Sequence, residues 1–191
     1  MFRPIANTRS NTGIPTGRLA VWWLLASEIV IFGGVLAAYL IHRLGHGEDF
    51  ALQASHTNPW IGGLNTFVLL TSSMMAVCAH VAAENNDGKK AAKYLWLTVL
   101  GGGIFLCIKS FEWYIEISGG YTITSHPFWG FYYTAAGIHA SHVIAGMILM
   151  AHVATTAAKN KNMNRVENVA IYWHFVDLVW IFLFPLLYIA K

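Results

Sequence analysis

Five long apolar runs constrain this chain more than any other feature of its sequence. They cover approximately residues 19–41, 60–83, 94–117, 128–157 and 166–190. A helix needs about 20 apolar residues to cross the hydrocarbon core of a bilayer. Because backbone polar groups in lipid must be satisfied internally, long apolar runs of this kind are expected to be helical. We therefore predict an all-α integral membrane bundle of five transmembrane helices.

The composition supports a membrane protein and argues against nucleic-acid binding. Hydrophobic residues make up 56% of the 191 residues and charged residues only 11%, whereas a soluble domain is usually about 25% charged. The formal net charge is only +3, and the basic residues lie in short clusters between the apolar runs. No long linker or internal repeat interrupts the pattern. We expect residues 1–191 to form a single transmembrane domain that begins with a short polar tail at 1–18.

The distribution of Lys and Arg predicts the direction of the helices. Three basic residues lie in the tail at 1–18, three in the connection near 84–93 and three in the connection near 158–165. The opposite side has only Arg43 and Lys191. Because Lys and Arg are enriched in cytoplasmic connections, the N-terminus and the tail are expected in the cytoplasm. Five crossings then place the C-terminus outside.

Five ionisable side chains fall near the middle of the predicted membrane: Glu28, His139, His142, His174 and Asp177. At a rise of about 1.5 Å per residue, they lie at similar depth on three helices. The two histidines of the fourth run are three residues apart, as are the His and Asp of the fifth run, so each pair shares a helical face.

These pairs have two interpretations. Paired histidines at helical spacing can ligate a metal or a haem. The alternative is a network of hydrogen bonds between helices, with Asn65 and Ser72 as further members. The sequence has neither the HExxH pattern of zinc enzymes nor the repeated Glu-x-x-His of di-iron bundles, which favours the network.

Glu28 is the strongest single functional candidate. A carboxyl group at this depth must be protonated or paired, because an unpaired charge in hydrocarbon is costly. One interpretation is a proton-active or lipid-facing carboxyl. The other is a neutral acid bonded to a His or Ser of the next helix.

A charged group is predicted near the outer end of the third helix. Lys109 and Glu112 are three residues apart, and Glu116 follows four residues later. We interpret them as an outer-side ion pair that faces the bundle. The alternative, a charged ion pathway, is disfavoured because the charges do not continue to the inner side.

Several segments resemble the motifs of subunit III of the haem-copper respiratory oxidases, in order and in approximate spacing. They are "WWLLASEIVIFGG", "LNTFVLLTSS", "SFEWYIE", "GIHASHVIAG" and "VENVAIYWHFVDLVWIFLF". The resemblance covers roughly residues 21–188. The long form of this family has seven transmembrane helices, and this chain lacks the first pair. It is therefore similar to the short bacterial form, which implies the bacterial inner membrane and a periplasmic C-terminus.

The resemblance implies an accessory, non-catalytic and non-metal-binding role in a proton-pumping terminal oxidase that reduces oxygen to water in aerobic respiration. In this family the haems and copper belong to subunits I and II, so no cofactor is expected in this chain. Subunit I is the expected main partner, with subunit II and other small subunits nearby. The family role is to stabilise subunit I, hold structural phospholipid and sustain proton uptake.

The resemblance also extends to single residues. Glu28 matches the family's membrane-embedded, carbodiimide-reactive glutamate, which is tied to proton uptake or lipid. The paired residues of the fourth and fifth runs match packing and hydrogen-bonding positions. Arg165 is expected to contact a phospholipid head group. We expect His174 and Asp177 to face the bundle interior, with His139 or His142 as their partner.

Two other functions fit part of the sequence. A homologous small protein associated with nitric oxide reductase shares the same motifs and length. A stand-alone proton transporter could use the mid-membrane acids and imidazoles as a relay. Transporters commonly carry inverted repeats and broken helices, and the sequence shows neither.

Overall fold

A computed structural model describes residues 16–190 of the chain. Most of the predicted tail at 1–18, and Lys191, lie outside the described residues. Six α-helices and a terminal π-helix follow one another along the described chain: α1 Thr16–Gly45, α2 Gly47–Ala54, α3 Pro59–Glu84, α4 Gly88–Ser118, α5 Pro127–Ala157, α6 Asn164–Phe184 and η2 Pro185–Ile189. All but α2 and η2 are long and apolar enough to cross a membrane, which confirms the predicted five-helix architecture.

The long helices begin where local chemistry favours a helix start. The Asn58 side chain accepts hydrogen bonds from the first backbone N–H groups of α3, and the Asp87 side chain accepts one from α4. His126 does the same for α5. Proline occupies the first position of α3 and of α5, where its missing N–H costs nothing. Side-chain caps of this kind satisfy backbone donors that the helix itself leaves unpaired.

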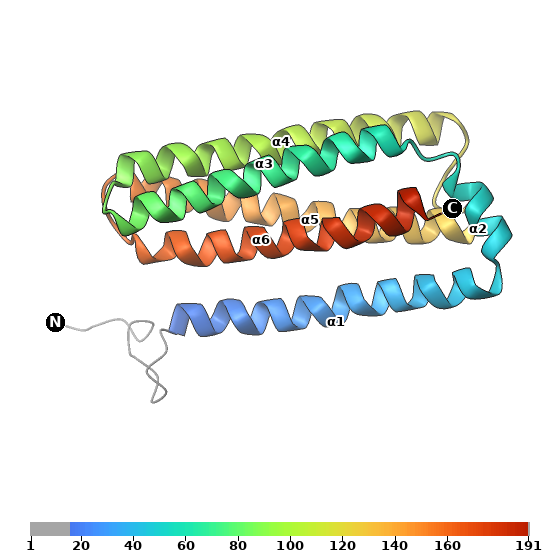
Figure 1. Ribbon diagram of the computed structural model, residues 1–191, viewed down its shortest axis with the longest axis horizontal. Coiled ribbons are helices and arrows are strands. Elements are labelled where there is room, and N and C mark those ends of the chain that lie inside the picture. The colour runs from blue at the N-terminus through green and yellow to red at the C-terminus, as the bar shows by residue number, and fades with distance from the viewer. Residues whose placement is uncertain (1–15, 191) are drawn as a thin grey trace.

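Helices α3, α4, α5 and α6 form an antiparallel four-helix bundle, and α1 runs alongside it (Figure 1). In this bundle consecutive helices pack against each other, and α6 closes the ring against α3. The contacts of α1 with the bundle are fewer and fall mainly on α6 and α5. This arrangement leaves α1 as the least buried of the five long helices.

Helix α2 was not predicted from the apolar runs. It lies across one end of the bundle (Figure 1) and buries Phe50 and Ala54 on one face. Trp129 of α5 donates a 2.9 Å hydrogen bond from its indole nitrogen to Gln53. With only eight residues, α2 is too short to show a transmembrane pattern, so hydropathy alone does not reveal it.

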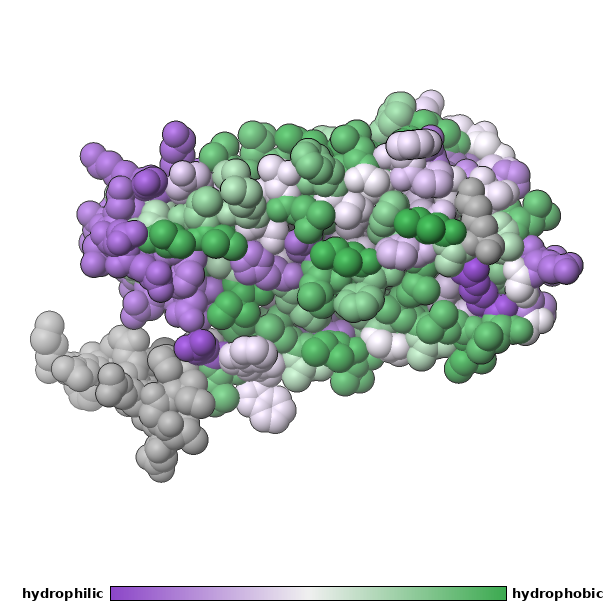
Figure 2. All heavy atoms as spheres, viewed as in Figure 1, coloured by the Kyte–Doolittle hydropathy of each residue, from purple (hydrophilic) through white to green (hydrophobic). Residues whose placement is uncertain are grey.

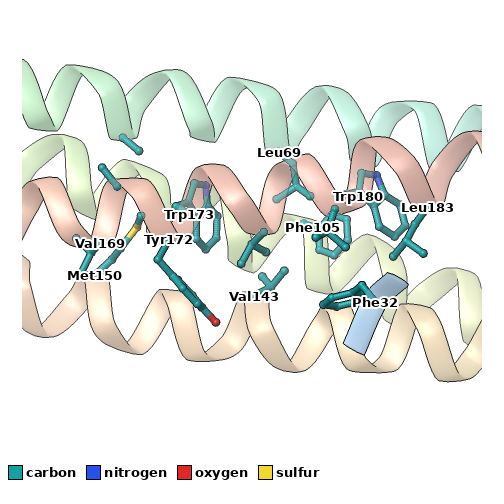
Figure 3. Close-up of a cluster of buried hydrophobic side chains, with 14 of the residues drawn as sticks. Phe32, Leu69, Phe105, Val143, Met150, Val169, Tyr172, Trp173, Trp180 and Leu183 are labelled. Carbon is teal, nitrogen blue, oxygen red and sulfur yellow. The ribbon is translucent and has the colours of Figure 1, made fainter. Parts of the chain in front are cut away.

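The core is aromatic and closely packed (Figure 3). Trp173, Trp180 and Phe105 are completely buried inside the four-helix bundle. Gly102 makes room for this packing, because a Cβ atom there would lie 2.7 Å from the ring of Trp173. The outer surface is largely hydrophobic along the helices, and hydrophilic residues gather at the end that carries the α3–α4 and α5–α6 connections (Figure 2).

Candidate functional site: polar groups at mid-membrane depth

Glu28 of α1 meets His142 of α5. The carboxylate Oε2 and the imidazole Nε2 are 2.9 Å apart, and Glu28 is only 7% exposed. The other ring nitrogen, Nδ1, lies 2.7 Å from the carbonyl oxygen of Ile138, which can only accept. Nδ1 therefore carries a hydrogen. Nε2 lies against Oε2 of Glu28, an oxygen that has no hydrogen-bond partner among the described residues. Glu28 and His142 therefore form a close acid–imidazole contact between α1 and α5.

Neighbouring side chains enclose this pair and link three helices. The ring of Phe32, one turn after Glu28, packs edge-on against His142 with centroids 5.4 Å apart. Tyr172 of α6 directs its hydroxyl group at the carbonyl oxygen of His142, at 3.4 Å. The acid, imidazole and phenol thus connect α1, α5 and α6 at mid-membrane depth.

The prediction for the partner of His174 and Asp177 is wrong. His174 Nδ1 lies 2.6 Å from the hydroxyl oxygen of Ser73 on α3, and neither His139 nor His142 takes that place. The cause is the rotation of α6, which directs its tryptophans into the bundle and His174 toward α3. Asp177 lies on the same side and is 6% exposed, and its Oδ1 has no hydrogen-bond partner among the described residues.

His139 forms no hydrogen bond with the other ionisable groups of the described chain. It is completely buried, and neither ring nitrogen has a hydrogen-bond partner within residues 16–190. Its ring packs against Trp180 and Phe105, with centroids 5.1 and 5.5 Å away. The shared face of His139 and His142 therefore does not become a shared site.

Ser72 and Asn65, the two further candidates for the polar network, differ in their hydrogen bonds. Ser72 accepts a 3.1 Å hydrogen bond from the indole nitrogen of Trp173 and donates to the carbonyl oxygen of Leu69. It therefore links α3 to α6. Asn65 is fully buried, and its amide group has no hydrogen-bond partner in the described part of the chain.

Lys109, Glu112 and Glu116 form the core of a buried charged cluster. The ammonium group of Lys109 lies 3.0 Å from a Glu112 oxygen, and both side chains are 2% exposed. It also donates to the hydroxyl groups of Tyr132 at 2.8 Å and of Tyr188. Tyr132 in turn donates to Glu116 at 2.9 Å. All three ammonium donors are therefore used, and the cluster joins α4, α5 and η2.

Sequence reasoning missed the two tyrosines of this cluster. They come from other helices, and nothing in the local pattern around Lys109 points to them. Their aromatic faces add to the contact, since Nζ lies 4.5 Å from the ring centroid of Tyr132 and 5.1 Å from that of Tyr188. A signal was available in principle, because buried tyrosines near helix ends usually need a polar partner for their hydroxyl groups.

Two further observations bear on ligands. Within residues 16–190, no three His, Cys, Asp or Glu side chains gather closely enough to hold a metal ion. Arg165 is exposed in the first turn of α6, at the hydrophilic end of the molecule. The polar contacts as a whole join two or three helices each, and Glu28 with His142 is the one acid–imidazole contact between helices in the described part of the chain.

Comparison with known proteins gives a consistent result. Residues 7–191 match the sequence profile of the family described as "Cytochrome c oxidase subunit III". The chain is 32% identical over 170 residues to "Cytochrome c oxidase subunit 3" of Thermostichus vulcanus, which covers 86% of this chain and 83% of that protein. It is 33% identical over 174 residues to the protein of the same name in Corynebacterium diphtheriae, with coverages of 87% and 84%.

A third relative has a different organisation. The chain is 27% identical over 188 residues to "Heme-copper oxidase subunit I+III" of Aeropyrum pernix. The match covers 91% of this chain but only 22% of that protein.

Proposed function

The chain belongs to the cytochrome c oxidase subunit III family, and from that premise we propose that it is the accessory, non-catalytic subunit of a proton-pumping haem-copper terminal oxidase. Such an enzyme reduces oxygen to water in aerobic respiration. The haems and copper are placed in partner subunits, and this chain holds none of them.

The observation that carries this proposal is the pairing of mid-membrane polar groups across helices. Glu28 contacts His142, His174 contacts Ser73, and the indole of Trp173 bonds Ser72. Each contact joins two helices rather than converging on a common centre. Interhelical polar contacts of this kind stabilise membrane bundles. They support a packing subunit better than a redox subunit or a continuous ion pathway.

Subunit I is the proposed main partner, with subunit II and other small subunits beside it. A subunit III belongs to a complex with other oxidase subunits, and the relative named "subunit I+III" supports a particularly close relation to subunit I. The proposed role is to stabilise subunit I, hold structural phospholipid and sustain proton uptake. The close contact of the Glu28 carboxyl group with the His142 imidazole supports the last part, because both are groups that can exchange protons within the membrane layer.

The proposed location is a bacterial inner membrane, with the N-terminus in the cytoplasm and the C-terminus in the periplasm. Basic residues of the α3–α4 and α5–α6 connections support this direction, since both clusters lie at one end of the bundle (Figure 2). Arg165 is exposed at that end, which supports the proposed contact with a phospholipid head group. Reporter fusions to both termini test the direction, and a cytoplasmic C-terminus would refute it.

The test of the function is purification in mild detergent through an affinity tag on this chain, followed by mass spectrometry and visible spectroscopy. We expect oxidase subunits I and II to co-purify, with haem and copper, in a complex that consumes oxygen. A complex that reduces nitric oxide but not oxygen would contradict the proposal. So would proton flux through liposomes that contain this chain alone, if Glu28→Gln abolished it.

A further inference from the structure

The contact between α3 and α6 carries polar side chains at two levels, which Ala76 and Val77 of α3 separate. Ser73, His80 and Glu84 follow each other on one face of α3, and His174 and Asp177 lie on the facing side of α6. We refer to these five residues as the polar seam. Seen along the bundle, the seam begins at the hydrophilic end, where His80 lies 3.5 Å from Glu84. It extends to mid-membrane depth at Ser73 and His174.

The chain satisfies only part of this seam. The bond to Ser73 uses Nδ1 of His174, and within residues 16–190 no hydrogen bond involves the other ring nitrogen, Nε2. His174 is half-buried, and it lies ten residues into α6, roughly 15 Å from the helix start. At that depth there is no bulk water, and an unpaired polar group in hydrocarbon is costly. Something outside this chain must therefore meet Nε2.

The surroundings of the seam resemble the centre of a protein interface. Exposed apolar side chains border it on both helices, namely Leu70 and Val77 on α3 and Leu178 and Ile181 on α6. A polar centre within an apolar rim is typical of contacts between membrane helices. The outer face of α4 is different, because its exposed residues at the same depth, Leu97, Leu100 and Ile104, are all apolar and suit acyl chains.

We propose that the polar seam is the docking surface for a transmembrane helix of another oxidase subunit. That helix places a hydrogen-bonding side chain opposite Nε2 of His174, and its apolar residues cover Leu178 and Val77. A hydroxyl or amide group fits best, because it can donate or accept and so serves either tautomer of the imidazole. Lipid tails cannot replace it, since they offer no hydrogen bond. The inference rests on the proposed function, because it requires a partner subunit in the same membrane.

Two matched leucines test what covers the seam. Leu178, one turn after His174, is 50% exposed, and Leu100 on α4 is 59% exposed. A photoreactive benzoylphenylalanine is introduced at either position in the tagged chain of the assembled complex. We expect irradiation to join position 178 to another subunit and position 100 to lipid. Lipid adducts alone at position 178, or an adduct of two copies of this chain, would overturn the proposal.

Two substitutions of His174 test the role of the individual nitrogens. In Asn the side-chain amide reaches the position of Nδ1, and in Gln it reaches the position of Nε2. We expect H174Q to retain the partner subunit through purification. H174N should keep the bond to Ser73 but retain on the order of tenfold less partner, which is the equilibrium effect of losing one hydrogen bond. Equal retention in the two variants, or the opposite order, would overturn the proposal.

These outcomes are separable from failure of the proposed function. If no pigmented subunit co-purifies with the unaltered chain, the proposed function itself is wrong. If such subunits co-purify but position 178 never reaches them, only the docking surface is wrong.

Discussion

Removing the ammonium group of Lys109 should destabilise the protein more than any exposed substitution. The three hydrogens of this group are donated to Glu112, Tyr132 and Tyr188, and the side chain is 2% exposed. Lys109→Met keeps the length and apolar part of the side chain and removes only the charge and its bonds. The carboxylate of Glu112 is then left buried without a cation. Breaking a buried pair in this way costs about 3–5 kcal/mol.

The assay is the free energy of unfolding of the purified chain in mixed micelles, measured by titration with a denaturing detergent. Lys93→Met is the matched control, because Lys93 lies on the same helix and is exposed, and it should leave the free energy unchanged. In the double variant Lys109→Met/Glu112→Gln, both charges are gone. We expect it to regain roughly half of the loss or more, since removing a whole buried pair is often close to neutral.

The reasoning is refuted if Lys109→Met and Lys93→Met have the same effect. It is also refuted if the double variant is less stable than Lys109→Met, because an unpaired carboxylate would then not be the cause.

Three other predictions concern helix contacts. Glu28→Gln should preserve the docking of α1, because the amide can donate to Nε2 of His142. Glu28→Leu should cost about 1–3 kcal/mol of stability by leaving that nitrogen unpaired. Thermal unfolding midpoints in detergent compare the two variants, and equal midpoints would contradict the contact. Gly102→Val should cost roughly 1–3 kcal/mol by collision with a tryptophan ring of α6, while Gly103→Ala, whose new Cβ would meet its nearest neighbour at 3.8 Å, should be tolerated. Asp177→Ala should lower the yield of assembled complex but leave the haem spectrum of the surviving enzyme normal; an altered spectrum would indicate a cofactor role.

Hydropathy was sufficient to predict the architecture. Each long helix contains one apolar run, because the bilayer imposes both its length and its helical form. The spacing of Lys109 and Glu112 also predicted contact correctly, since three residues bring two side chains onto one face of a single helix. Features within one helix could therefore be predicted from the sequence.

Contacts between helices could not be predicted from the sequence in the same way. Depth placed His139, His142 and His174 in one layer, but depth does not fix the rotation of each helix about its axis. Rotation separates these residues, so that His142 meets Glu28, His174 meets Ser73 and His139 packs against aromatic rings. The rotation depends on how large side chains fit together, for example a tryptophan against a glycine, and that fit is a property of the whole bundle.

The central claim is that the acid and imidazole groups at mid-membrane depth hold helices together and bind no metal or haem. The most direct test is the visible spectrum and the elemental metal content of this chain, expressed without its partner subunits and purified in detergent. We predict no Soret band and no stoichiometric iron, copper or zinc. A bound metal or haem that disappears in His139→Phe or His142→Phe would contradict the claim.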